Sequence, residues 1–321
     1  MKVAMIGVGG MGGLHYGEYK NIKDAEVVAV CDVRLDMLKE KPEGDNVRLY
    51  SDYREMLEKE KPDLVDVCTP TYLHAEPAIA ALESGAHVLC EKPMAISLED
   101  TKRMMEAAEK SGKLLMIAQV VRFMQAYAYL RDVIKSEKYG KLVHMDMKRI
   151  GGIPAWSWED WMRDEKRSGL VMLDLMVHDI DYMQSIFGNP KDVNGVYNPL
   201  TNNNSYAQAN YIYDGFSVSI VSGWYNGNPK FDMGATAIFQ DGYVIVDNGK
   251  VIDNGEEVSF DDAGVVGETG INLSNVDGYA CEIMYFMDCI KNGKKPLMSL
   301  PESAANSVRL VEETKKKLTI V

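Results

Sequence analysis

The sequence of 321 residues lacks several features that would assign it to a specialised class of protein. Its five cysteines form no CxxC pair and no cluster with histidine, so we expect reduced thiols and no bound metal ion. No apolar run is long enough to span a membrane, and no signal peptide precedes the first apolar segment. A net charge of −13 argues against nucleic acid and anionic membranes as partners. These absences favour a soluble, cytoplasmic protein.

The length and the hydrophobic pattern indicate two domains, because 321 residues exceed the size of one ordinary core. Up to about residue 121, short apolar runs alternate with helical segments, which is typical of a doubly wound parallel sheet. Residues 193–247 instead hold several runs joined by short turns, which predict mostly antiparallel pairing. We therefore predict an α/β first domain at residues 1–121 and an α+β second domain with an open sheet at residues 122–299. The last helix, at about residues 300–321, is a candidate to pack back on the first domain.

A glycine-rich turn follows the first predicted strand, at residues 2–8. Gly7, Gly9 and Gly12 fit the pattern GxGxxG, in which the glycines allow a tight turn, close approach of a pyrophosphate and close packing of helix on strand. The helix that follows would present backbone N–H groups and its positive dipole end to the phosphates, so Gly10 and Met11 belong to the same predicted site. The strand–turn–helix context predicts a dinucleotide cofactor.

An aspartate directly follows the second predicted strand, at residues 26–31. Asp32 lies 20 residues past Gly12, where an acid can accept hydrogen bonds from the ribose hydroxyls of adenosine. Its charge would also repel a 2′-phosphate, which favours NAD over NADP. Arg34, two residues further on, leaves NADP possible. The alternative interpretation makes Asp32 a turn residue or a helix cap.

Polar residues also follow the third and fourth predicted strands, as Thr69-Pro70 and Glu91-Lys92. The carboxyl ends of parallel strands meet at one edge of a sheet, where ligands bind in doubly wound folds. We therefore expect these four residues to line the cofactor crevice. The ammonium of Lys92 could bind a substrate hydroxyl or lower its pKa, or it could be an ordinary solvated lysine. For His74, which opens the following helix, we favour packing or hydrogen bonding at the helix end.

The stretch at residues 169–188 is apolar around nearly its whole circumference and predicts one buried helix of about five turns. It nevertheless carries Asp174, His178 and Asp181, which fall on one stripe of a regular helix. Buried charges cost several kcal/mol unless they are paired or face a cavity. Two interpretations follow: a structural Asp–His pair in the core, or a stripe that faces a substrate cavity, with His178 as the proton carrier.

These motifs together resemble the glucose–fructose oxidoreductase/inositol dehydrogenase family, often called Gfo/Idh/MocA. The matching segments are GVGGMG at Gly7, CTPT at Cys68, HVLCEKP at His87 and SGLVMLDLMVHDIDYM at Ser168. The resemblance implies an N-terminal Rossmann domain that binds NAD(H) or NADP(H), and a C-terminal domain whose open sheet is used in oligomerisation. One departure is visible before the helix, where the family often has two or three glycines and Ser168-Gly169-Leu170 has one.

The resemblance also implies that Lys92, Asp174 and His178 form the catalytic set. The expected activity is that of an NAD(P)-dependent dehydrogenase acting on a secondary alcohol of a sugar, polyol or cyclitol, in a homodimer or homotetramer. His178 would take the hydroxyl proton, Asp174 would orient substrate or imidazole, and Lys92 would stabilise charge on the reacting oxygen. Two alternatives remain: a non-catalytic NAD(P)-binding sensor or scaffold, and an enzyme that uses tightly bound NAD for net non-redox glycoside chemistry.

Overall fold

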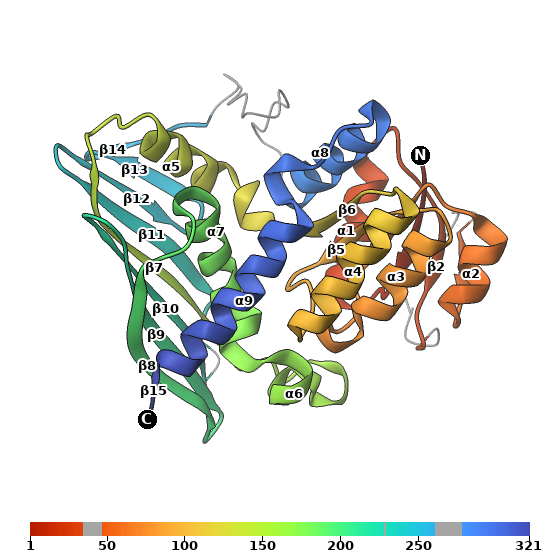
Figure 1. Ribbon diagram of the computed structural model, residues 1–321, viewed down its shortest axis with the longest axis horizontal. Coiled ribbons are helices and arrows are strands. Elements are labelled where there is room, and N and C mark those ends of the chain that lie inside the picture. The colour runs from red at the N-terminus through yellow and green to blue at the C-terminus, as the bar shows by residue number, and fades with distance from the viewer. Residues whose placement is uncertain (35–46, 228, 261–277) are drawn as a thin grey trace. The chain divides into compact units, whose positions relative to one another are not determined.

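The computed structural model describes residues 1–34, 47–227, 229–260 and 278–321 (Figure 1). Contacts divide the chain into two compact units, Met1–Gln119 with Tyr279–Ala305, and Val120–Gly278 with Asn306–Val321. The predicted second domain extended to residue 299, whereas contacts assign Tyr279–Ala305 to the first unit. One cause is Ser299, whose hydroxyl donates a hydrogen bond of 2.6 Å to the Ile117 carbonyl in that unit.

A six-stranded sheet forms the centre of the first unit. Its strands are Lys2–Ile6 (β1), Glu26–Cys31 (β2), Arg48–Tyr50 (β3), Leu64–Val67 (β4), His87–Glu91 (β5) and Leu115–Ala118 (β6). They are ordered β3-β2-β1-β4-β5-β6, and each described pair is parallel. This confirms the predicted doubly wound sheet. The order reverses between β1 and β4, and ligands of such sheets bind at the carboxyl ends beside that point.

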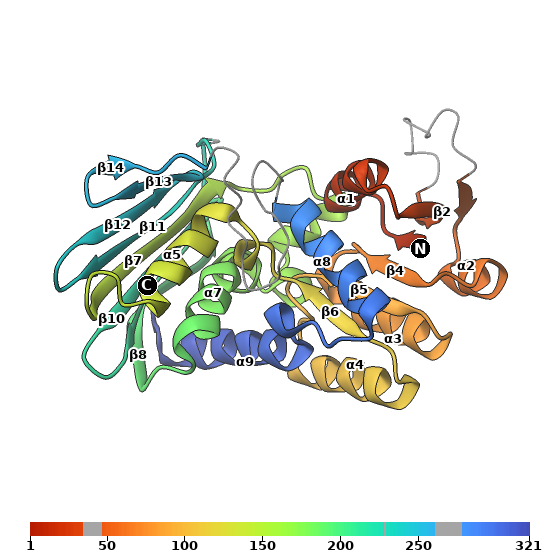
Figure 2. The same ribbon diagram turned by 90° about the horizontal axis from the view of Figure 1, so that it is seen from above.

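Helices cover both faces of this sheet. They include α1 (Gly10–Asn21), α2 (Tyr53–Glu60), α3 (Ala75–Glu83), α4 (Leu98–Ser111) and nearly all of α8 (Gly278–Asn292). Figure 2 shows α3 and α4 on one side of the sheet and α1 and α8 on the other. Two helices begin at polar residues that suit an N-cap, since Asp52 accepts a hydrogen bond from the Arg54 N–H and Ser97 accepts one from the Asp100 N–H.

A nine-stranded sheet dominates the second unit. Its strands are Leu142–Gly152 (β7), Asp192–Thr201 (β8), Asn204–Ile212 (β9), Ser217–Tyr225 (β10), Asp232–Phe239 (β11), Tyr243–Asp247 (β12), Lys250–Asp253 (β13), Glu256–Glu257 (β14) and Thr319–Ile320 (β15). Their order is β14-β13-β12-β11-β7-β10-β9-β8-β15. Most neighbours are antiparallel, as predicted, but β7 with β10 and β8 with β15 are parallel. Turn patterns could not reveal these two pairs, because each joins strands that are distant in sequence.

Helices cover one face of the nine-stranded sheet. They are α5 (Gln125–Lys135), α7 (Val177–Phe187) and most of α9 (Pro301–Lys317), as Figure 1 shows, while the short α6 (Glu165–Ser168) lies before α7. On β9, Ala207, Ala209 and Tyr211 are buried on this face, and the Tyr211 hydroxyl lies 3.1 Å from Thr314 Oγ1 of α9. Within the described ranges, every helix is too short or too polar to cross a bilayer.

Candidate active site

The glycine turn between β1 and α1 has two glycines that the chain itself requires. Gly7 has a φ of +85°, and a β-carbon there would lie 2.7 Å from the Cys68 carbonyl oxygen. A β-carbon at Gly12 would overlap the Gly7 carbonyl oxygen. At Gly9, by contrast, the nearest atom to such a β-carbon is Arg34 Nη2, at 3.7 Å. The fold therefore requires glycine at Gly7 and Gly12, whereas at Gly9 a β-carbon would make only an ordinary contact with the Arg34 side chain, which leaves Gly9 for the predicted approach of a phosphate.

The N-terminus of α1 lies at this turn and fits an anionic group. Gly9 is the N-cap, and it provides no side-chain hydrogen bond to the helix. The first turn carries no acidic residue that would compete with a phosphate. The backbone N–H groups of Gly10 and Met11, together with the positive end of the helix dipole, therefore suit a pyrophosphate.

Asp32 follows β2 and ties the end of that strand to the glycine turn. Its Oδ2 accepts a hydrogen bond from the Val8 N–H at 3.1 Å, and its Oδ1 accepts one from the Arg34 N–H at 2.9 Å. The Arg34 guanidinium lies beside the same carboxylate, with Nε 3.8 Å from Oδ1. Asp32 thus makes the contacts expected of a turn residue, which was the alternative interpretation of this aspartate. Since a carboxylate can accept about four hydrogen bonds, its predicted contact with a ribose is compatible with these.

Thr69 and Pro70 lie just beyond β4, at the carboxyl edge of the sheet. Thr69 Oγ1 is buried and has no hydrogen-bond partner among the described residues. A buried hydroxyl without a partner costs about 1–3 kcal/mol, and a ligand group or a water that bonds to it removes that cost. Together with the uncrowded backbone at Gly9, this hydroxyl fits a bound dinucleotide.

His74 connects the loop after β4 to the loop after β5. Its Nε2 lies 2.9 Å from the Thr69 carbonyl oxygen, and its Nδ1 lies 2.9 Å from the Pro93 carbonyl oxygen. Burial lowers the pKa of His74, so its neutral ring donates to one of these two oxygens. The hydrogen bonding expected for His74 at the helix end is confirmed, but the sequence did not reveal that its partners lie on both loops.

Glu91 ends β5 and Lys92 follows it. Glu91 is only 5% exposed, and its Oε2 accepts a hydrogen bond of 3.0 Å from the Lys92 backbone N–H. Its Oε1 lies 3.1 Å from Nε2 of the buried His15. The carboxylate is thus engaged inside the first unit, and its contact with a cofactor remains a prediction. Lys92 is half-buried and precedes Pro93.

One buried cluster in the first unit combines residue types that can bind metals. His15 Nδ1 lies 2.9 Å from Asp66 Oδ2, and the Cys68 thiol donates to Asp66 Oδ1 at 3.2 Å. The sequence spacing showed no cysteine near a histidine; the fold places Cys68 Sγ 3.6 Å from His15 Nδ1. Burial raises the pKa of Cys68, so its sulfur keeps its proton. Hydrogen bonds through His15 Nδ1 join these side chains, and His15 Nε2 has no hydrogen-bond partner among the described residues. We interpret the cluster as a hydrogen-bonded one.

The central helix has the predicted extent but not the predicted regularity. Helical backbone runs from Val171 to Phe187, and Met172–Met176 form a wider π-helical turn before α7. Asp174 lies inside that wide turn and is buried, and His178 is half-buried in the first turn of α7. The predicted stripe of Asp174, His178 and Asp181 assumed a regular helix with roughly 100° per residue, and this angle does not apply across a π turn. Turns of this kind are often found at functional sites.

Asp181 is not part of a substrate-facing stripe, and that interpretation of it is wrong. It accepts hydrogen bonds from Arg122 Nε at 2.7 Å and Arg122 Nη2 at 2.6 Å, and the Ser307 hydroxyl donates to it at 2.8 Å. Asp179, which the sequence did not single out, pairs with the buried Arg149 at 2.9 Å. Burial raises the pKa of Asp179, and Arg149 opposes that shift. Both carboxylates anchor α7 within the second unit.

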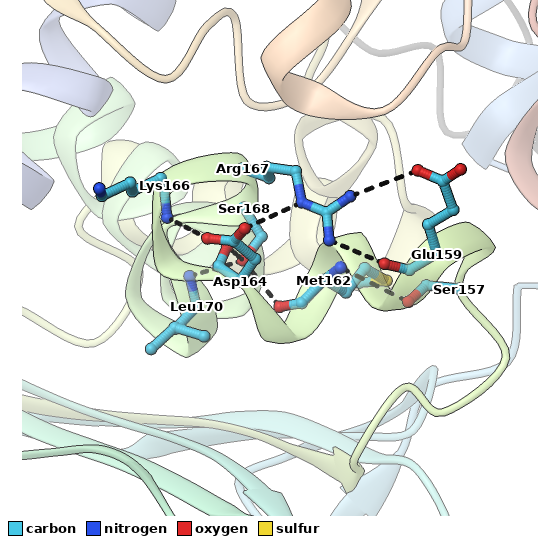
Figure 3. Close-up of polar contacts among 8 residues, drawn as sticks. All are labelled: Ser157, Glu159, Met162, Asp164, Lys166, Arg167, Ser168 and Leu170. Atoms are coloured by element: carbon cyan, nitrogen blue, oxygen red, sulfur yellow. Dashed lines mark hydrogen bonds and ion pairs between the residues drawn. The ribbon is translucent and has the colours of Figure 1, made fainter.

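The entry to the central helix is held by Ser168, as Figure 3 shows. Its hydroxyl donates to the Met162 carbonyl at 2.7 Å and accepts from the Leu170 N–H at 2.9 Å. Gly169 has a φ of +70° and Leu170 a φ of +53°. The backbone of Leu170 is thus in the left-handed conformation, which costs a non-glycine residue about 1–2 kcal/mol. This is the position at which the sequence has leucine instead of a further glycine. Hydrogen bonds of Ser168 help to hold that conformation.

The predicted site residues divide between the two units. The glycine turn, Asp32, Arg34, Thr69, Pro70, Glu91 and Lys92 lie at the carboxyl edge of the sheet in the first unit, as expected. Asp174 and His178 belong to the second unit. A surface hollow of about 740 Å³, lined by Met1, Asp63 and His87, lies at the amino ends of the strands and contains none of the predicted residues.

The parallel sheet, the glycine turn and the acidic residue after β2 define a dinucleotide-binding Rossmann domain. The chain belongs to the Gfo/Idh/MocA oxidoreductase family. Residues 1–119 match the "Oxidoreductase family, NAD-binding Rossmann fold", and residues 127–246 match the "GFO/IDH/MocA C-terminal domain". The resemblance recognised in the sequence is therefore confirmed.

Similar proteins include dehydrogenases of a cyclitol and of a glucoside. Myo-inositol 2-dehydrogenase of Thermotoga maritima is 34% identical over 189 residues, which are 59% of this chain and 55% of that protein. D-glucoside 3-dehydrogenase of Escherichia coli is 33% identical over 200 residues, 60% of this chain and 56% of that protein. The chain thus spans little more than half the length of these curated relatives. The crystal structure of a probable dehydrogenase from Thermotoga maritima shares the fold, with a TM-score of 0.80, 24% identity, and coverage of 99% of this chain and 96% of its own.

Proposed function

We propose that this protein is an NAD(P)-dependent dehydrogenase that acts on a secondary alcohol of a sugar, polyol or cyclitol. The observation that carries the proposal is the match of both units to one oxidoreductase family, whose members named above act on a cyclitol and a glucoside. The uncrowded backbone at Gly9, the uncapped start of α1 and the Thr69 hydroxyl, which has no partner among the described residues, support the cofactor site. When bound, the nicotinamide supplies the hydride chemistry.

The catalytic roles follow from the chemistry of three side chains. His178 takes the proton of the reacting hydroxyl while the C–H bond of the carbon that bears this hydroxyl breaks. In the reverse reaction His178 returns the proton to the oxygen. The Lys92 ammonium donates a hydrogen bond to the reacting oxygen and stabilises its developing negative charge. Asp174, in the π turn that precedes His178, orients the substrate or the imidazole. These assignments rest on the family motif and on the positions of the three residues: Lys92 directly after β5, Asp174 in the π turn and His178 in α7.

A screen of polyols and sugars tests the proposal directly. The protein is incubated with each candidate and with NAD or NADP, and NADH or NADPH absorbance is followed. Reduction of the cofactor with at least one sugar, polyol or cyclitol is expected. Absence of turnover with every candidate would favour a binding protein, while turnover of a glycoside without added cofactor would favour non-redox chemistry with tightly held NAD.

We expect NADH to bind more tightly than NADPH, by about tenfold or more, because the Asp32 carboxylate would repel a 2′-phosphate by at least 1.4 kcal/mol. In Asp32→Ser the preference should shrink or reverse, since Arg34 can then meet the phosphate. Asp32→Asn is the matched control, because its amide oxygen can still accept from the Val8 N–H while the charge is gone. Fluorescence titration with both cofactors gives the dissociation constants. Tenfold tighter binding of NADPH to the wild type would contradict this role of Asp32.

We also propose that the second unit assembles into a homodimer or homotetramer. The face of the nine-stranded sheet opposite its helices mixes polar and apolar residues, with Tyr206 and Gln208 on β9 and Thr236 and Ile238 on β11. Ile238 is 43% exposed. Light scattering at micromolar concentration should give the mass of a dimer or tetramer, and a stable monomer would contradict this assembly.

A cytoplasmic location completes the proposal. All five cysteines are buried free thiols, which suits a reducing compartment. The net charge of −13 agrees with a small-molecule substrate rather than nucleic acid. Fractionation of the source cells, with detection of the protein by antibody, tests the location.

A further inference from the structure

His15 of α1 is completely buried between two carboxylates that come from neighbouring strands of the first unit. Its Nδ1 lies 2.9 Å from Asp66 Oδ2 of β4, and its Nε2 lies 3.1 Å from Glu91 Oε1 at the end of β5. Asp66 is also completely buried, and Glu91 is 5% exposed. One imidazole therefore touches both acids at once, far from water.

Charge and hydrogen bonding together indicate which form of His15 is present. A neutral imidazole carries one N–H and turns a lone pair toward the second carboxylate, which is repulsive. An imidazolium has an N–H on each side and partly compensates two buried negative charges. Burial alone would lower the pKa of His15, but attraction by Asp66 and hydrogen bonding outweigh it and raise that pKa well above its ordinary value. Among the described residues, the titratable groups that face the ring include Asp66 of β4, Cys68 just after it, Glu91 at the end of β5 and Tyr279 on α8.

Glu91 connects this buried cation to the motif lysine. One oxygen of its carboxylate faces His15 Nε2, and the other accepts a hydrogen bond of 3.0 Å from the Lys92 backbone N–H. The contact of Oε1 with His15 Nε2 is an ion-pair contact without hydrogen-bond alignment, so His15 holds this oxygen through charge, while the Lys92 N–H holds the other oxygen by a hydrogen bond. If His15 lost its charge, the Glu91 carboxylate would lose its cationic neighbour. The Lys92 N–H would then donate to a carboxylate whose position is no longer fixed.

We propose that His15 is a positioning residue: its buried imidazolium fixes the Glu91 carboxylate, which in turn holds the Lys92 backbone at the carboxyl end of β5. The same cation bonds Asp66, which binds the Cys68 thiol, and the Cys68 carbonyl lies against Gly7. One residue of α1 thus links the helix after the glycine turn to the ends of two strands. The inference rests on the proposed function only for what Lys92 does in catalysis.

The charge of His15 can be observed directly by ¹⁵N NMR on protein labelled at histidine. We expect both ring nitrogens of His15 to be protonated at pH 7.5. His87 is the internal reference: it lies at the opposite end of β5, its Nδ1 accepts from the Leu114 N–H at 3.0 Å, and burial lowers its pKa, so one nitrogen should be protonated. The variants His15→Gln and His87→Gln assign the two signals. A neutral His15 at pH 7.5 would overturn the proposal.

The link to Lys92 can be measured without substrate by amide hydrogen exchange resolved to single residues. In His15→Gln we expect exchange at the Lys92 N–H to rise about tenfold, the equivalent of one lost hydrogen bond, with smaller changes in β6 and α4. His87→Gln, the matched control on the same strand, should leave Lys92 unchanged. An unchanged rate at Lys92 in His15→Gln, or an equal rise throughout the unit, would overturn the proposal, because the second result describes a merely structural residue.

A second variant covers the case in which His15→Gln fails to fold. Glu91→Gln keeps the shape of the side chain and an oxygen that can accept from the Lys92 N–H, but it removes one anion from His15. The NMR titration of His15 should then move to lower pH, and an unmoved titration would show that Glu91 does not hold the cation. If Lys92 exchange rises in His15→Gln while Lys92→Ala turns over normally, the positioning inference stands and the catalytic role proposed for Lys92 is wrong.

Discussion

His178→Ala is expected to lower kcat by a factor on the order of 10²–10⁴, the range for loss of a general acid–base group. The dissociation constant of NADH should change little, because the glycine turn and Asp32 belong to the first unit and His178 to the second. Lys92→Ala should have an effect of similar size, since it removes the charge that stabilises the reacting oxygen. Both kcat values are measured with the best substrate from the screen.

The control for this experiment is His144→Ala. His144 is the other histidine of the second unit, lies on β7, and has its Nδ1 2.8 Å from the Ser217 hydroxyl on the neighbouring strand. Its loss should leave kcat within a factor of about two, as expected for a substitution outside a catalytic site. A comparison of the two variants separates loss of a catalytic group from the general effect of removing an imidazole from this unit.

The structural interpretation of His178 predicts the opposite pattern. If Asp174 and His178 only satisfied each other in the core, His178→Ala would leave a buried carboxylate unpaired, and stability would fall by several kcal/mol. The folded fraction would then keep its turnover. Melting temperature and kcat are therefore measured on the same sample. A folded His178→Ala protein with nearly normal turnover would end the catalytic assignment of this helix.

Local features of the fold could be predicted because neighbouring residues determine them. Each of three segments follows from residues that are close together in the sequence. They are the glycine turn, the strand before Asp32 and the helix that starts after Ser97. The alternation of strands and helices then predicted the parallel sheet, and with it the shared edge on which the cofactor residues of the first unit lie.

Features that depend on distant partners could not be predicted. Arg122 lies 59 residues before Asp181, and Ser307 lies 126 residues after it, so no local pattern revealed that this aspartate is fully engaged. The same holds for His15 and Asp66, which are 51 residues apart in the sequence. The π turn at Met172–Met176 has a different cause, since it widens a segment whose composition suits a regular helix. Sequence periodicity assumes regular geometry and misses such a turn.

Asp181→Ala is expected to destabilise the second unit by about 3–5 kcal/mol, the usual cost of removing one partner from a buried ion pair. The side chain of Arg122 is only 6% exposed, and it would keep its charge without the carboxylate that binds two of its nitrogens. The Ser307 hydroxyl would lose its acceptor as well. The effect should appear in the unfolding midpoint, with little change in NADH affinity, because these residues belong to the second unit.

Tryptophan fluorescence during urea unfolding measures this loss selectively, because all four tryptophans, Trp156, Trp158, Trp161 and Trp224, belong to the second unit. Asp214→Ala is the matched control: Asp214 pairs with Lys191 on the surface of the same unit, both side chains are more than 60% exposed, and the expected loss is about 0–1 kcal/mol. The double variant Arg122→Met with Asp181→Leu should recover much of the stability, since an apolar pair leaves no buried charge unpaired. If Asp181→Ala cost no more than Asp214→Ala, the buried pair would not anchor α7. Recovery in the double variant would show that most of the cost of Asp181→Ala comes from the stranded guanidinium, as expected for an aspartate whose partner is the buried Arg122.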